Sequence, residues 1–221
     1  MKASFQDGKI QQDVLHELEW DSRVDCTQIG VTVQGAVVTL HGTVDSWAAK
    51  LAAQDAAHRV DGVLDVANEL VVAPKANHLR SDAEIAAAAR HALTWDVFVP
   101  DDKIRTTVTH GIVLLEGEVD YASQRDEASR AVGNLAGVCG VDNQLVVARL
   151  SIDAEALRTA IRAALERHAT READKLEIAI DRGRVTLSGR VDSWDDRKAI
   201  VGVVRGTRGV ESVVDHLTLG A

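Results

Sequence analysis

The sequence predicts an α+β fold made of three tandem α-β-β-α-β domains, each a three-stranded mixed sheet with two helices packed on one face. The pattern V-x-L-x-G-x-V-D occurs at 38–45, 113–120 and 185–192, so the copies are offset by 75 and 72 residues. They align without a gap over about 60 residues, which indicates internal repetition of one domain. Within each copy, apolar residues alternate between helical and strand spacing.

The first copy shows how the elements follow from this spacing. Ile10, Val14 and Leu18 recur every four residues and predict a helix with one apolar face. Alternation over 29–33 and 38–44 predicts a hairpin of two strands. A second amphipathic helix is expected over 49–60, begun by Asp45 or Ser46 as its N-cap. A third strand follows over 66–72, and a right-handed crossover should make it parallel to the second.

The domains are expected at 6–74, 80–148 and 152–220, with short links at about 73–80 and 148–152. Short links indicate that the domains are restricted in their arrangement rather than free to move independently.

Three sets of recurring residues are interpreted as structural. The motif glycine alternates in step with the core residues of its strand and is therefore expected to face the core. There a missing side chain would let a helix approach the sheet. A second glycine fits the stop of the second helix, and a polar residue in the third strand should bond a loop or helix-end backbone group. These sets are Gly42, Gly117, Gly189; Gly62, Gly137, Gly209; and Asn68, Asn143, Asp215. The recurring Asp45, Asp120 and Asp192 are interpreted as helix caps.

The L-x-G-x-V-D strand end, the G-V-x-x-V-x-N-x-L third strand and the order of elements resemble the BON domain (bacterial OsmY and nodulation). The resemblance covers nearly the whole chain as three copies. It implies non-enzymatic modules of bacterial stress and envelope proteins, linked with binding of phospholipid or protein.

The residues themselves show no motif for nucleotide, phosphate or zinc binding and no Cys-x-x-Cys pair. No constellation of nucleophile, base and orienting partner emerges, so an enzyme is not expected, nor is a metal or other cofactor. Trp20 and Trp95 follow the first helix of their copies and are expected to cover the core. Trp47 and Trp194 begin the second helix, where contact with a partner and plain packing are equally supported.

Charge is distributed unevenly along the chain. Residues 6–74 hold 11 Asp and Glu against 4 Lys and Arg, whereas residues 149–221 hold 12 against 13. The candidate interaction surface therefore combines the two tryptophans with basic residues of the third copy: Trp47, Trp194, Arg158, Arg162, Lys198, Arg205, Arg208. These residues could face anionic lipid headgroups. Alternatively, the basic copy docks onto acidic copies within the chain or in a homo-oligomer. An acidic protein with few aromatic residues does not fit nucleic acid.

Two functions remain open at this point. One is a binding protein whose tandem modules engage anionic phospholipid membranes or envelope-associated proteins. The other is a cytoplasmic osmotic or general stress protein that protects or scaffolds other proteins. No apolar run is long enough for a transmembrane helix. The polar N-terminus lacks the core of a secretory signal, which predicts the cytoplasm as the sequence stands and the periplasm if a signal has been removed.

Overall fold

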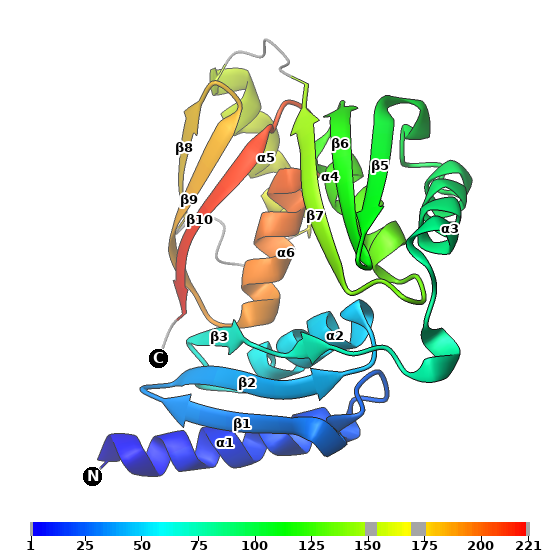
Figure 1. The fold of residues 1–221 in the computed structure, drawn as a ribbon. Helices are drawn as coiled ribbons and strands as arrows, with labels where there is room; N and C mark the ends of the chain where they lie inside the picture. Colours follow the sequence, from blue (N-terminus) through cyan, green and yellow to red (C-terminus); the bar gives the residue numbers. More distant parts are fainter. Residues whose placement is uncertain (1, 149–153, 169–175, 220–221) are drawn as a thin grey trace. The chain divides into compact units, whose positions relative to one another are not determined.

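The computed structural model describes residues 2–148, 154–168 and 176–219, in which three domains repeat the order helix, strand, strand, helix, strand (Figure 1). This confirms the expected fold class. The first domain consists of α1 (Lys2–Trp20), β1 (Ile29–Gln34), β2 (Val37–Val44), α2 (Trp47–His58), β3 (Asp65–Asn68) and β4 (Val71–Val72), with a 3-10 turn η1 (Cys26–Gln28) before β1. A second 3-10 turn, η2 (Ala76–His78), follows it.

The second and third domains have the same plan. The second consists of α3 (Asp82–Trp95), η3 (Asp101–Lys103), β5 (Ile104–Thr109), β6 (Ile112–Val119), α4 (Ala122–Gly133) and β7 (Gly140–Val147). The third consists of α5 (Ala154–His168), β8 (Glu177–Asp181), β9 (Arg184–Val191), α6 (Trp194–Arg205) and β10 (Ser212–Leu219).

The second strand of each domain is the centre of its sheet. In the first domain, β2 pairs antiparallel with β1 and parallel with β3 and β4, which are two pieces of one interrupted edge strand. The order β5-β6-β7 repeats this plan, and β9 likewise pairs antiparallel with β8 and parallel with β10. The parallel crossover expected from the sequence is thus present.

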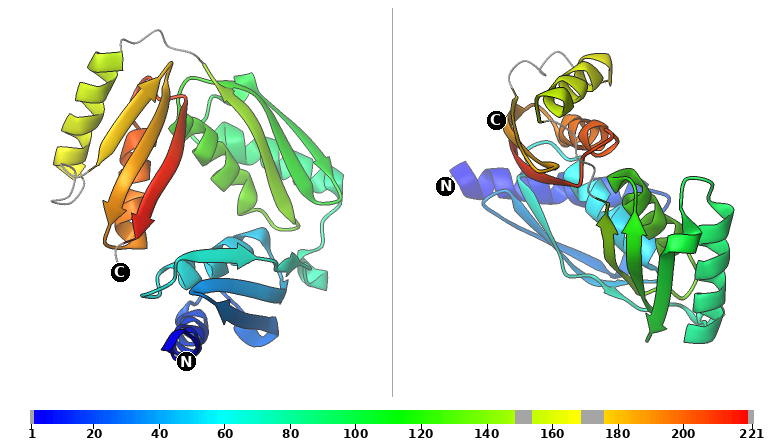
Figure 2. Two further views of the ribbon diagram at one scale, coloured as in Figure 1. Left: turned by 90° about the vertical axis from the view of Figure 1, so that its left-hand side faces the viewer. Right: turned by 90° about the horizontal axis from the view of Figure 1, so that it is seen from above.

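Each core lies between the sheet and its two helices. The first-helix positions predicted to be apolar are 0–3% exposed in all three copies: Ile10, Val14, Leu18, Ile85, Ala89, Leu93, Leu157, Ile161 and Leu165. Alternate residues of β2, such as Val38 and Leu40, meet them from the sheet. Helix α1 packs on α2, and α5 on α6, so both helices lie on one face of the sheet (Figure 2). The other face carries exposed side chains such as His41.

The hairpin turns have positive φ at both central residues, which is the type I′ geometry that suits twisted strands. In the first domain, the turn N–H groups of Gly35 and Ala36 donate to the carboxylate of Asp7 on α1, at 3.1 and 2.9 Å. Asp82 on α3 accepts from His110 and Gly111 in the same way, at 2.9 Å each. In these two domains the first helix is therefore tied to the hairpin by a carboxylate as well as by its apolar face.

Candidate interaction surfaces

The motif glycine is required by backbone geometry. Gly42 has φ of +116°, and a Cβ built there would lie 2.0 Å from the carbonyl oxygen of Gln28, just before β1. Gly117 repeats this with φ of +138° and a distance of 2.1 Å to the carbonyl oxygen of Lys103. Gly42 and Gly117 are exposed rather than turned to the core. The expectation that the glycine makes room for a helix is wrong, because the close neighbour is backbone at the start of the antiparallel strand.

The second recurring glycine also has a left-handed backbone. Gly62, Gly137 and Gly209 have φ of +87°, +86° and +97°. They lie past the end of the second helix, in the turn that leads to the third strand. The C-cap of α2 is Arg59, and that of α6 is Gly206, both with right-handed helical φ and ψ. The glycine therefore does not stop the helix itself, as expected from sequence, but turns the chain three residues later.

The motif aspartate is not the helix cap that the sequence indicated. Ser46 Oγ accepts from the Ala49 N–H at 3.2 Å and caps α2, and Ser193 Oγ accepts from the Asp196 N–H at 3.1 Å and caps α6. Asp45 instead forms an ion pair with Lys75, with Nζ and Oδ2 3.3 Å apart.

The second domain keeps this ion pair with a different lysine. Asp120 binds Lys103, with 3.1 Å between Nζ and Oδ1. The carboxylates raise the pKa of both lysines, chiefly through hydrogen bonds to Asp45 and Asp120. A carboxylate neutralised by a nearby lysine is better explained as a structural contact than as a catalytic base.

The polar residue of the third strand ties that strand to the second helix. Asn68 Nδ2 donates to the Lys50 carbonyl oxygen at 2.9 Å, while its Oδ1 accepts from the Leu70 N–H at 3.3 Å. Asn143 repeats both bonds, with a distance of 2.7 Å from Nδ2 to the Arg125 carbonyl oxygen. In the third domain, Asp215 accepts from Arg197 Nε at 2.7 Å instead. All three side chains therefore have hydrogen-bond partners.

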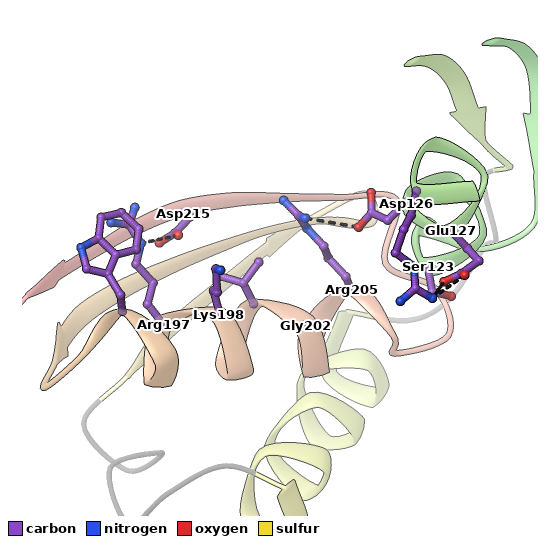
Figure 3. A pocket seen from close by; sticks show the side chains of 11 residues that line it. Ser123, Asp126, Glu127, Arg197, Lys198, Gly202, Arg205 and Asp215 are labelled. Carbon is purple, nitrogen blue, oxygen red and sulfur yellow. Dashed lines mark hydrogen bonds and ion pairs between the residues drawn. The ribbon is translucent and has the colours of Figure 1, made fainter. Parts of the chain in front are cut away.

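Basic residues of the third domain lie on both of its helices. On α6, Arg197, Lys198 and Arg205 project from the helix, with Asp215 beside Arg197 (Figure 3). Lys198 is exposed, as is Arg208 just beyond the helix end. On α5, Arg162 is exposed, and the half-buried Arg158 bonds Glu155 at 2.7 Å.

The two tryptophans that begin second helices each pair with a cation on their own helix. The Arg197 guanidinium carbon lies 4.5 Å from the centroid of the Trp194 ring, and Lys50 Nζ lies 5.8 Å from that of Trp47. Arg197 is not among the residues predicted from the sequence, although a cation three residues after a helical tryptophan is a recognisable signal. Trp194 and its neighbours thus form an aromatic end of α6 that carries charges of both signs, because Asp195 and Asp196 precede Arg197 and Lys198.

Trp20 and Trp95 do not cover the core. Their exposed fractions are 75% and 74%, and Trp20 Nε1 donates to His16 Nε2 on the same helix at 2.9 Å. The prediction of burial is wrong because Leu18 and Leu93, two residues earlier on the same helices, already fill the core at 0% exposure. The side chain two positions later points about 200° away around the helix. Both tryptophans are therefore displayed at the end of the first helix.

The perturbed ionisable groups have structural causes. The pKa of Asp21 is well below its ordinary value because Arg23 and Arg59 donate hydrogen bonds to its carboxylate. The pKa of Asp82 is lowered by the turn N–H groups of Gly111 and His110. Across the described residues, no group of three or more His, Cys, Asp or Glu side chains could hold a metal ion. None of the described helices is long and apolar enough to cross a membrane.

A family model for the BON domain matches residues 6–74, 81–149 and 153–221. The chain belongs to the BON domain family. It is 30% identical over 143 residues to osmotically-inducible protein Y of Escherichia coli (strain K12), covering 63% of this chain and 71% of that protein. These matches confirm three BON copies.

Two solved structures of CdsD, a structural protein of the type III secretion system of Chlamydia trachomatis, also align with this BON chain. Both are 13% identical with a TM-score of 0.27. They cover 96% and 95% of this chain, and 92% and 96% of theirs. A TM-score this low supports no inference about fold or function.

Proposed function

We propose that this protein is a non-catalytic, envelope-associated stress protein that binds anionic phospholipid membranes through its third BON domain. The observation that carries the proposal is the combination of Trp194 at the start of α6 with the exposed cations of the same domain, which are Arg162, Lys198 and Arg208. Trp194 stacks with Arg197, and the next residue of the helix, Lys198, is exposed. Each basic residue near an anionic surface contributes about 1 kcal/mol of attraction, and tryptophan suits the boundary between headgroups and acyl chains.

The name of the Escherichia coli relative supports the stress-related part of this proposal, because that protein is described as osmotically inducible. The non-catalytic part is supported by the ion pairs of the motif aspartates. In two of the three domains the motif aspartate, Asp45 or Asp120, is held by a lysine. A general base has to be within hydrogen-bond reach of a substrate proton, whereas these carboxylates bind lysine.

The test is co-sedimentation of the full chain with phosphatidylglycerol vesicles at increasing salt. We expect binding at low salt that falls as the salt concentration rises, because headgroup attraction is screened. A variant without three exposed cations of the third domain, R162Q/K198Q/R208Q, should bind at least about tenfold more weakly.

The matched control removes three exposed cations from the other domains, as K9Q/R80Q/R105Q. It has the same net charge as the test variant, so long-range repulsion from the membrane is equal in the two. Equal loss of binding in both variants would contradict a site on the third domain. Absence of sedimentation at low salt would contradict membrane binding altogether.

A further inference from the structure

The loop that ends α3 displays three large apolar side chains. In this Trp95 loop, defined as residues 95–99, Trp95 is 74% exposed, Val97 89% and Phe98 72%. Scattered apolar residues on a surface need no explanation, but a cluster on one loop of a folded domain indicates a contact site. Of the loop's apolar residues, only Val99 is buried, at 6% exposure.

The Trp95 loop is held in shape by its own hydrogen bonds. The Phe98 N–H donates to Asp96 Oδ1 at 2.9 Å, and the Val99 N–H donates to the Asp96 carbonyl oxygen at 3.1 Å. Across the loop, Thr94 Oγ1 donates to Asp101 Oδ2 at 2.8 Å. With the buried Val99 as an anchor, the exposed side chains project from an ordered backbone. Binding therefore does not have to order the loop first.

The first domain contains the same turn with different chemistry. There the Arg23 N–H donates to Asp21 Oδ1 at 3.1 Å, and the Val24 N–H donates to the Asp21 carbonyl oxygen at 3.0 Å. Ser22 and Arg23 stand where the second domain has Val97 and Phe98. The turn thus forms with polar side chains at both positions. The fold does not need apolar residues at these positions, so packing within the domain does not explain Val97 and Phe98. Contact with a ligand would explain them.

We propose that the Trp95 loop inserts into the interface of a lipid membrane and prefers uncharged headgroups. A stable protein interface buries about 800 Å² on each partner. One tryptophan, one phenylalanine and one valine on a small loop fall short of that area, since an aromatic side chain buries about 150–250 Å². A membrane interface needs no matching surface, and tryptophan and phenylalanine are the side chains typical of interfacial anchors.

The charges around the Trp95 loop decide the choice of lipid. Asp96 and Asp101 take part in the hydrogen bonds of the loop, and Asp102 is exposed beside them. Two cations interact with carboxylates of this region, and both are paired with other acids: Lys103 with Asp120, and Arg130 with Glu127. These carboxylates would be repelled by anionic headgroups and not by zwitterionic ones. The inference rests on the membrane association proposed above, but it assigns a different chemistry to a different domain.

The experiment measures binding of the full chain to phosphatidylcholine vesicles with brominated acyl chains, which quench tryptophan fluorescence only at close approach. We expect quenching that changes little between low and high salt. The variant V97S/F98R gives the second domain the residues of the first. Its partition coefficient should fall at least about tenfold, because burial of a phenylalanine side chain alone contributes that much. W95F should remove most of the quenching signal.

The control L79S/V146R makes the same type of exchange at apolar residues that are 60% and 63% exposed elsewhere in the chain. It should bind as the unaltered protein does. Equal binding by V97S/F98R and the unaltered chain would overturn the inference. A second pair of results would also overturn it: no binding of the chain to neutral vesicles, and loss in V97S/F98R alone of the ability to suppress aggregation of an unfolded client protein. Those results would mean that the Trp95 loop binds proteins instead of lipid.

Parallel measurements on phosphatidylglycerol vesicles separate this inference from the proposed function. One outcome is salt-sensitive binding that is lost in R162Q/K198Q/R208Q and retained in V97S/F98R, with no binding to neutral vesicles. This outcome would support the proposed function and overturn the insertion of the Trp95 loop. Salt-insensitive binding to neutral vesicles that is lost only in V97S/F98R would support insertion of the Trp95 loop and not binding through the exposed cations of the third domain.

Discussion

The first and third domains attach the third strand to the second helix with different chemistry. In the first, Asn68 donates its amide N–H to the helix backbone at Lys50. In the third, Asp215 has no N–H to donate, and the side chain at the position of Lys50, Arg197, donates to it instead. In both, the side-chain oxygen also accepts from the backbone N–H two residues later. Both domains therefore require a hydrogen-bonded polar side chain at this position of the third strand. Two different pairs of residues meet that requirement.

The two domains do not differ at the motif glycine. Gly42 and Gly189 have φ of +116° and +138°, a range that only glycine adopts without strain. A side-chain bond can be rebuilt with another pair of residues, whereas a backbone conformation closed to L side chains cannot. We therefore expect the largest mutational effects where the two domains are alike and smaller effects where they differ.

The largest effect is expected from G42A. The new Cβ would meet the Gln28 carbonyl oxygen at 2.0 Å and strain the backbone. We expect the first domain to lose about 3 kcal/mol or more of its free energy of unfolding. Urea unfolding followed by resolved NMR amide signals of each domain measures this. G8A in the exposed part of α1, where a Cβ meets nothing within 4 Å, is the control and should instead stabilise the domain by about 0.5–1 kcal/mol. Equal stability of G42A and G8A would refute the glycine requirement.

An intermediate effect is expected from exchanging the polar residues between the two domains. N68D places a carboxylate against the Lys50 carbonyl oxygen without a donor between them, so the first domain should lose about 1–3 kcal/mol. D215N keeps an acceptor for the Leu217 N–H but leaves Arg197 without its counter-charge, and should cost about 1 kcal/mol. The same amide signals report both values.

The double variant R197K/D215N installs the first domain's pair in the third and provides the control. It should recover most of the stability lost in D215N, because the asparagine can then donate to the helix backbone as Asn68 does. A double variant less stable than D215N would show that the two solutions are not interchangeable.

The smallest effect is a dependence of stability on pH that comes from Asp21, which the first domain has and the third domain lacks. Hydrogen bonds from Arg23 and Arg59 hold the pKa of Asp21 well below its ordinary value. A group whose pKa is lower in the folded state contributes stability above its unfolded pKa of about 4 and loses it as the pH falls further. The aligned positions of the third domain hold His168 and Gly206 and cannot form this pair.

We therefore expect D21N to reduce the first domain's stability at pH 7 by about 1 kcal/mol and to make its decline below pH 4 less steep. Unfolding curves between pH 7 and pH 2 would check both. An unchanged acid limb in D21N would mean that the ion pairs of Asp21 contribute nothing to stability, and the third domain serves as the internal reference.

Prediction from sequence succeeded for features that depend on neighbours along the chain. Helix and strand positions follow from local apolar spacing, and Val14 and Leu40 are buried at 0% exposure as that spacing indicates. It failed where a distant segment decides. The bonds of Asp7 to a turn 28 and 29 residues away leave no local pattern. The sequence indicates a helix cap for the repeated aspartate because Lys75, the partner of Asp45, lies 30 positions away.

The candidate surfaces divide in the same way. The sequence identified the basic residues of the third domain and Trp194 but placed Trp95 in the core, so it missed the Trp95 loop. Four of the five residues from Trp95 to Val99 are apolar, and composition alone cannot say which side chains point outward. Leu93 and Val99 fill the space on the core side, leaving Val97 and Phe98 exposed.

The sequence by itself determined that this chain is a threefold repeat of one α-β-β-α-β domain, because periodic apolar residues specify elements and their recurrence specifies copies. Only the tertiary structure decided why the repeated glycine must be glycine and what the repeated aspartate binds. It also decided which tryptophans are displayed. Those features depend on distances between atoms far apart in the chain, such as the Gln28 carbonyl oxygen against Gly42, and close approach across strands exists only once the sheet has formed.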